Sequence, residues 1–231
     1  MVLKVFRWAP GSRERLQKYW VPAKEGMTVL DALVDVERRL DPTLAFRYAC
    51  RVGMCGSCAM VINGRERWAC RTLLRHLRAG PVTVRPLYHF PLIRDLVVDM
   101  APFRERMLAV GAAFEPSPAD QEPPVVGGES EERRRIDPAV ECIGCGMCVS
   151  ACTMVAHDRH FPGPAALNRA FTLQEDSRDG QRAERGARLL VGDALARCHG
   201  QGNCTAVCPM EISPSESIAA LRRQAVLGLF R

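Results

Sequence analysis

Eleven cysteines constrain this chain more than any other feature of its sequence. They occur in three groups, at 50–70, 142–152 and 198–208. An odd number of cysteines cannot pair completely, and a chain of 231 residues can bury an apolar core without disulfide cross-links. The pattern therefore predicts reduced thiolates that hold metal.

The first group has the spacing C-x4-C-x2-C-x11-C and comprises Cys50, Cys55, Cys58 and Cys70. Its first three members have the spacing of plant-type ferredoxins, which bind a 2Fe-2S cluster. Gly53 and Gly56 allow the positive-φ turns that point backbone N–H groups at sulfur. The pair Asn63-Gly64 predicts a β-hairpin that brings Cys70 to the site. We predict a 2Fe-2S cluster here, with structural zinc as the alternative because four thiolates also suit tetrahedral zinc.

The other two groups resemble each other. One has the spacing C-x2-C-x2-C-x3-C, at Cys142, Cys145, Cys148 and Cys152; the other has C-x5-C-x3-C-P, at Cys198, Cys204 and Cys208. The last run lacks one cysteine, because Gln201 stands three positions after Cys198. In two-cluster ferredoxins the fourth cysteine of each run ligates the other cluster. This crossover predicts a 4Fe-4S cluster on Cys142, Cys145, Cys148 and Cys208.

The crossover leaves only three thiolates for the last site, namely Cys152, Cys198 and Cys204. An amide such as Gln201 is a poor ligand for a soft iron-sulfide site. A 3Fe-4S cluster, which lacks one corner iron, matches three ligands. The alternative is a 4Fe-4S cluster whose last iron binds water or another group.

Composition divides the chain into a domain at 1–105, a connecting segment at 106–132 and a second domain at 133–231. The stretch from Phe114 to Arg135 combines prolines, glycines and a mixed charge run, which is typical of a linker or a long surface loop. In the first domain we predict strands at 2–8, 17–21, 59–62, 65–69 and 81–86. A helix at 28–40 should begin at the N-cap Thr28 and bury Leu30, Leu33, Val36 and Leu40.

The second domain should be helical. We predict helices at 164–175 and 181–190, and a last helix that begins with the capping box Ser213-Pro214-Ser215-Glu216. That helix presents Ile218, Leu221, Ala225 and Leu229 on one face. The predicted fold class is therefore α+β, with a sheet-containing domain followed by an all-helical one.

Charge and hydropathy exclude several functions. Residues 1–100 carry 17 basic and 9 acidic side chains, but the basic ones are scattered singly, without a nucleic-acid-binding motif. We predict a solvated or partner-docking face and no nucleic acid. The longest stretch without Asp, Glu, Lys or Arg is sixteen residues and is rich in Cys and Gly, so it should not span a bilayer. We see no targeting segment and expect an intracellular protein that reaches a membrane only through a partner.

Together these motifs resemble the iron-sulfur subunit of succinate dehydrogenase and fumarate reductase, respiratory complex II. The resemblance covers nearly the whole chain. Beyond the cysteine runs it includes the segments 51–58, 91–100 and 176–179 and the pair Cys198-His199. It implies a β-grasp 2Fe-2S ferredoxin-like domain followed by an all-helical two-cluster ferredoxin domain.

The resemblance also implies a function. The chain would conduct single electrons from a flavoprotein subunit, through the 2Fe-2S, 4Fe-4S and 3Fe-4S clusters, to a quinone at a membrane anchor. FAD would belong to the flavoprotein, and the anchor could hold haem b. The chain would lie peripherally at the cytoplasmic face of the inner or plasma membrane, held by the anchor. We predict no catalytic residues in this chain, since it has no dinucleotide fingerprint and no acid-base constellation.

One departure concerns the quinone. The family pattern has proline after the cysteine equivalent to Cys152 and a tryptophan shortly afterwards, whereas this chain continues with residues 153–158, TMVAHD. His157 is a candidate substitute donor, or else a surface residue. His199 corresponds to a family residue at the quinone and haem edge. One alternative function keeps the same three-cluster electron path but serves a different flavoprotein dehydrogenase or a non-quinone acceptor. Another is a structural metal protein or regulator that uses the cysteines for zinc binding or redox sensing.

Overall fold

A computed structural model describes residues 1–117, 124–191 and 194–228 of the chain. The chain divides into two compact units. The first comprises Met1–Met100 together with Ile143–Ala151, and the second comprises Ala101–Cys142 and Cys152–Arg231. The middle of the second cysteine run therefore packs with the first unit rather than with its neighbours in sequence.

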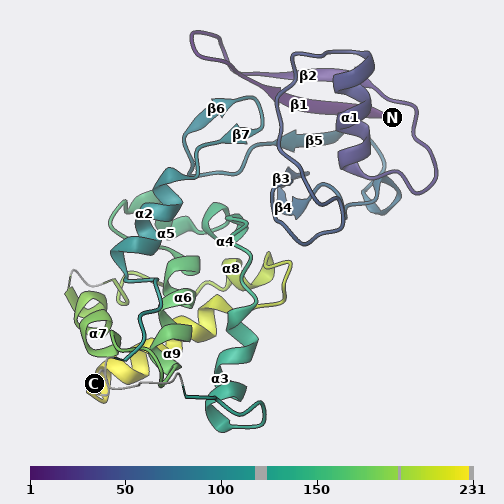
Figure 1. Cartoon of the computed structure of the whole chain (residues 1–231). Helices are drawn as coiled ribbons and strands as arrows, with labels where there is room; N and C mark the ends of the chain where they lie inside the picture. Colours follow the sequence, from purple (N-terminus) through teal and green to yellow (C-terminus); the bar gives the residue numbers. More distant parts are fainter. Residues whose placement is uncertain (118–123, 192–193, 229–231) are drawn as a thin grey trace. The chain divides into compact units, whose positions relative to one another are not determined.

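The first unit contains a five-stranded sheet with helix α1 (Val29–Arg39) lying across it (Figure 1). The strands are β1 (Val2–Arg7), β2 (Arg15–Trp20), β3 (Ala59–Ile62), β4 (Arg65–Trp68) and β5 (Val82–Arg85), in the order β2-β1-β5-β3-β4. Strands β1 and β5 are parallel, and the other pairs are antiparallel. A 3-10 turn (Leu74–His76) and a small hairpin of β6 (Leu92–Arg94) and β7 (Val97–Val98) complete the unit. This mixed sheet with one crossing helix confirms the predicted fold of the first domain.

Local sequence signals account for the elements around the first cysteine group. The hydroxyl of Thr28 accepts the Asp31 N–H at 3.1 Å, and the Asp31 carboxyl accepts the Thr28 N–H at 2.9 Å, which closes a capping box. Asn63 and Gly64 both have positive φ, 50° and 77°, as the β3–β4 hairpin requires. Leu40 differs from the prediction: it follows the last helical turn as the C-cap and is 52% exposed.

Helices make up the second unit. They are α2 (Ala101–Ala109), α3 (Glu131–Val140), α5 (Thr153–His157), α6 (Pro164–Glu175), α7 (Arg182–Leu190), α8 (Asn203–Ala206) and α9 (Pro214–Val226). Nearly every residue of α6 is buried, because α2, α3, α7 and α9 all pack against it. The structure confirms the predicted bounds of α6. The short α4 (Met147–Ser150) belongs to the first unit.

Two predictions about the second unit are wrong in part. The charge run that we assigned to the linker forms the first turns of α3, where the Ser130 hydroxyl accepts the Arg133 N–H at 3.1 Å. Ser213 does not cap α9 with its side chain, because the Glu216 N–H donates to the Ser213 carbonyl instead, at 3.1 Å. Leu229, predicted on the face of α9, lies outside the described residues.

The predicted connecting segment belongs to the second unit rather than standing between two domains. Its first residues lie in α2, so the predicted boundary at 105 falls within a helix. Further on, the Ser117 N–H donates to the Arg178 carbonyl at 3.1 Å, and the Gly180 N–H donates to the Glu115 carbonyl at 2.8 Å. These bonds fasten the segment to the loop between α6 and α7.

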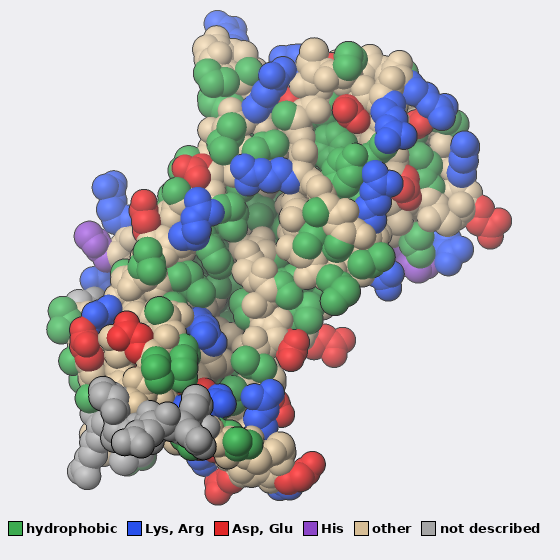
Figure 2. Space-filling view, viewed as in Figure 1, with side chains coloured by type: hydrophobic (Ala, Val, Ile, Leu, Met, Phe, Trp, Pro, Cys, Tyr) green, Lys and Arg blue, Asp and Glu red, His purple; other side chains and the backbone are tan. Residues whose placement is uncertain are grey.

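The surface agrees with the scattered charge pattern. On the face shown in Figure 2, the Lys and Arg side chains of the first unit are spread out singly rather than gathered into one patch. Among the described residues, no helix is both long enough and apolar enough to cross a membrane.

Candidate metal centres

The first three cysteines of the first centre lie in the loop between α1 and β3. The Cys50 sulfur accepts backbone N–H bonds from Met54 and Cys55, each at 3.3 Å. These turns need positive φ, which Arg51 (60°), Gly53 (82°) and Gly56 (70°) supply. Backbone N–H groups, from Val52 first and then Met54, lower the pKa of Cys50 to about 6. A thiolate at Cys50 is therefore stabilised by the loop itself, as a metal-ligating sulfur requires.

The hairpin closes this centre from the other side. The Ala69 N–H donates to the Cys58 carbonyl at 3.1 Å, which holds the end of β4 beside the loop. A side chain on Gly53 would come within 2.9 Å of Arg71 and 3.0 Å of the Trp68 ring, so the loop and hairpin fit only with glycine there. Burial raises the pKa of Cys58 to about 12, and Cys70 is also buried. A bound metal lowers the pKa of a thiol. Metal binding at this site would therefore offset the cost of burying a thiolate.

The cysteines predicted to hold the 4Fe-4S cluster are divided between the two units. Cys145 and Cys148 lie on the segment that packs with the sheet, whereas Cys142 and Cys208 belong to the second unit. Gly144 and Gly146 have positive φ, 65° and 80°, on either side of Cys145. The turns needed to wrap a cluster are present, and the complete ligand set stays a prediction.

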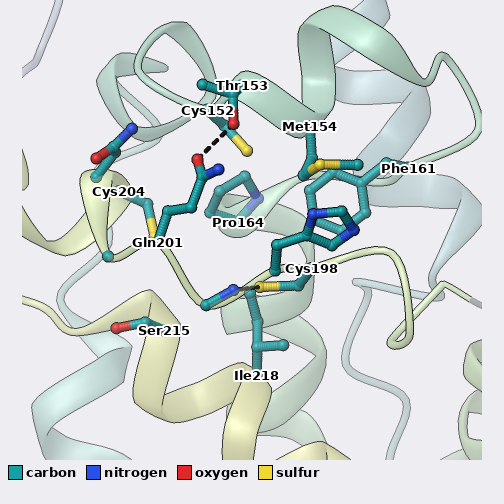
Figure 3. Close-up of a pocket in the computed structure, with 14 residues that line it drawn as sticks. Cys152, Thr153, Met154, Phe161, Pro164, Cys198, Gln201, Cys204, Ser215 and Ile218 are labelled. Atoms are coloured by element: carbon teal, nitrogen blue, oxygen red, sulfur yellow. Dashed lines mark hydrogen bonds between the residues drawn. The ribbon is translucent and has the colours of Figure 1, made fainter.

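The third centre is a pocket in the second unit. Cys152 precedes α5, Cys198 lies in the loop before α8, and Cys204 lies within α8; all three line the pocket (Figure 3). The Gly200 N–H donates to the Cys198 sulfur at 3.5 Å. Phe161, Pro164 and Ile218 contribute apolar surface, and burial raises the pKa of Cys204. The structure thus gathers the three cysteines predicted for the site that lacks a fourth thiolate.

Gln201 also lines this pocket, and its side chain is held in place. The Thr153 hydroxyl donates to the Gln201 Oε1 at 2.5 Å. Figure 3 shows the Gln201 amide nitrogen on the side that faces Cys152. In the sequence, Thr153 departs from the family pattern and Gln201 departs from the cysteine spacing. Nothing in the sequence indicates that these two side chains are in contact, because 48 positions separate them. His199 lines the same pocket, whereas His157 is an exposed residue at the end of α5 and does not.

All eleven cysteines are free thiols. Within the described part of the chain, no three His, Cys, Asp or Glu side chains converge closely enough to hold a single metal ion. Zinc would need its ligands gathered about one atom, whereas cluster thiolates bind different irons. Metal analysis therefore decides between these two predictions.

Comparison with known proteins identifies the family. A model described as a 2Fe-2S iron-sulfur cluster binding domain matches residues 2–105, and one described as a 4Fe-4S dicluster domain matches 139–212. The fumarate reductase iron-sulfur subunit of Mycobacterium tuberculosis (strain CDC 1551 / Oshkosh) is 38% identical over 224 residues, which cover 94% of this chain and 90% of the relative. The chain belongs to the family of succinate dehydrogenase and fumarate reductase iron-sulfur subunits.

Other relatives agree. The succinate dehydrogenase iron-sulfur subunit of Paracoccus denitrificans is 36% identical over 230 residues, covering 96% of this chain and 86% of the relative. A chain of the Mycobacterium smegmatis Sdh1 complex in the apo form has a TM-score of 0.87 and 28% identity, and the match covers 100% of this chain and 97% of that one. The fold class and the role as an electron-transfer iron-sulfur subunit of this oxidoreductase family are confirmed.

Proposed function

We propose that the chain conducts single electrons from an FAD-containing flavoprotein subunit to a quinone at a membrane anchor, as part of a succinate:quinone oxidoreductase. The observation that carries the proposal is the pocket of Cys152, Cys198 and Cys204. It offers three thiols, with Gln201 where a fourth would stand. A 3Fe-4S site beside His199 is the expected last carrier before the acceptor, and the anchor would hold the chain at the cytoplasmic face of the membrane.

The proposed ligand sets follow the three cysteine groups. A 2Fe-2S cluster would bind Cys50, Cys55, Cys58 and Cys70; a 4Fe-4S cluster Cys142, Cys145, Cys148 and Cys208; and a 3Fe-4S cluster Cys152, Cys198 and Cys204. Clusters of these types carry one electron at a time, as the splitting of a flavin's electron pair requires. The chain's own residues hold thiolates with backbone N–H groups, as at Cys50, and keep water away with apolar walls such as Phe161 and Pro164. We assign these roles to domains at 1–105 and 133–231.

A second candidate function keeps the clusters and changes the acceptor. The observation that favours it is the short helix α5, which places Thr153 and Met154 at the pocket. The family pattern has proline at the position of Thr153 and a tryptophan a few residues later. The three tryptophans of the chain, Trp8, Trp20 and Trp68, all lie in the first unit. Of the two histidines considered as quinone donors, only His199 lines the pocket. A non-quinone acceptor or a different flavoprotein dehydrogenase is therefore the alternative.

Metal analysis of the purified complex gives the first test. We expect about nine iron atoms per chain with matching acid-labile sulfide, since the three cysteine groups predict clusters of two, four and three irons. Stoichiometric zinc without sulfide would contradict the proposal and favour a structural or regulatory metal protein.

The electron path gives the second test. Succinate added to the intact complex should reduce the EPR-detectable centres and then a quinone. Reduction of the centres without quinone turnover would favour the alternative acceptor. Failure of succinate to reduce any centre would favour a different flavoprotein dehydrogenase.

The contact between Thr153 and Gln201 leads to a prediction about potential. In Thr153→Val the Gln201 amide loses its hydrogen bond, and its dipole is no longer fixed in the pocket with the three thiols. Because dipoles around a cluster tune its potential, the midpoint potential of the last centre should shift. An EPR-monitored redox titration measures it. Thr153→Ser keeps the hydroxyl and should keep the wild-type potential, and equal potentials in all three proteins would refute the effect.

A further inference from the structure

A buried hydrogen-bonded chain fastens the segment Ile143–Ala151 to the sheet of the first unit. The Tyr88 N–H donates to the Ser150 hydroxyl at 2.9 Å, and that hydroxyl donates to Oε1 of Glu66 at 2.7 Å. Ser150 is the last residue of α4, and Glu66 lies in β4. Ser150 is 2% exposed and Glu66 8%, so water cannot readily replace either partner.

The same segment presses against the loop of the first centre. A side chain on Gly56 would place its Cβ 2.6 Å from the Cys145 Cβ and 3.0 Å from the Cys145 Cα. Only glycine, which has no side chain, permits this approach, and its φ of 70° also favours glycine. Gly146 is similarly close to Phe90, whose ring would lie 3.1 Å from an added Cβ. A cysteine of the second group therefore touches the ligand loop of the first.

We propose that Ser150 and Glu66 are positioning residues that hold Cys145 against Gly56 and so set the distance between the first and second centres. The inference rests on the proposed function. In the step concerned, one electron originating from the reduced flavin of the partner passes from the first centre to the second, and no bond forms or breaks. Electron tunnelling slows steeply with distance, so a segment held at van der Waals contact gives a faster and more uniform transfer than a loosely attached one.

Ser150 can do this because its hydroxyl acts as both acceptor and donor. In Ser150→Ala the Tyr88 N–H and the Glu66 carboxyl both lose a partner in a buried place, which favours opening of α4 toward water. The cysteines themselves are unchanged, so the variant should still bind its clusters. What changes is how firmly Cys145 is held against Gly56.

The experiment compares Ser150→Ala with wild type in the intact complex. We expect full iron and sulfide content, faster hydrogen exchange of the amides at 145–151, and weaker dipolar coupling between the two reduced centres in pulsed EPR. Freeze-quench EPR should show at least tenfold slower transfer of an electron from the first centre to the second.

Two kinds of control separate positioning from general damage. Glu66→Gln keeps the acceptor oxygen at Oε1, so the dipolar coupling and the electron-transfer rate should stay at their wild-type values. Ser12→Ala makes the same chemical change at an exposed serine in the turn between β1 and β2, outside the ligand loop, and should have no effect. Glu66→Met removes the acceptor without altering Ser150, and should reproduce the effect of Ser150→Ala.

The outcomes distinguish the inference from the proposed function. Wild-type coupling and rate in both Ser150→Ala and Glu66→Met, with full iron content, overturn the inference alone. Loss of iron from both variants also overturns it, because the pair would then hold the ligands in place rather than set a distance. A wild-type complex without iron overturns the proposed function and this inference with it.

Discussion

Replacing Gln201 with cysteine should convert the last centre from three irons to four. Gln201 lines the pocket with the three cysteine thiols, at the position where the second cysteine run has a cysteine. An amide oxygen is a hard ligand that binds iron in a sulfide cluster poorly, whereas a thiolate is soft and binds it well. The Cys side chain is also shorter than Gln and loses the bond to Thr153, so nothing holds it away from the cluster.

EPR of the oxidised complex measures this conversion. An oxidised three-iron cluster is paramagnetic and an oxidised 4Fe-4S cluster is diamagnetic, so the signal should disappear while iron rises by about one atom per chain. Gln201→Ser, which supplies only a hard oxygen, should keep the three-iron signal. An unchanged signal in Gln201→Cys would contradict the vacant-corner assignment. If wild type itself shows no three-iron signal, the site is a 4Fe-4S cluster with a non-thiolate ligand.

Features fixed by neighbours in the chain could be predicted from the sequence. The turn at Asn63-Gly64, the capping box at Thr28 and the bounds of α6 each depend on residues within a few positions of one another. The cysteine spacings are equally local, and positive φ is found at Gly53 and Gly56 as expected. Local steric and hydrogen-bonding rules are enough for these elements.

Features that depend on distant residues could not be predicted. Ser150 and Glu66 are 84 positions apart, and no periodicity or motif connects them. The assignment of Ile143–Ala151 to the first unit follows from such contacts and cuts across a continuous cysteine run. The error at Ser213 is of another kind: the local pattern was right, but the backbone carbonyl took the N–H that the side chain was expected to cap.

A buried arginine network in the first unit also joins distant parts of the chain. Arg7 Nε donates to the Asp95 Oδ1 at 2.9 Å, and Arg7 also donates to the Tyr19 hydroxyl at 2.6 Å and pairs with Asp41. Only 5% of the Arg7 side chain and 3% of the Asp95 side chain are exposed. Asp95 further accepts the N–H groups of Trp8, at 3.0 Å, and Ala45, at 2.9 Å. One carboxyl therefore joins β1, the segment after α1 and the β6–β7 hairpin.

Asp95→Ala should lower the free energy of unfolding of the first unit by about 3–5 kcal/mol, because it leaves the Arg7 charge buried beside fewer partners. Asp95 has a φ of 46°, which asparagine tolerates better than alanine, so Asp95→Asn should lose less by keeping an acceptor and the backbone. Asp35→Ala removes an ion pair on the surface of α1 and should cost under about 0.5 kcal/mol. Denaturation of the complex, followed through the visible absorbance of the first cluster, measures all three. Equal losses of unfolding free energy in Asp95→Ala and Asp35→Ala would contradict this prediction. Water would then reach Arg7, and the network would stabilise the unit no more than a surface ion pair does.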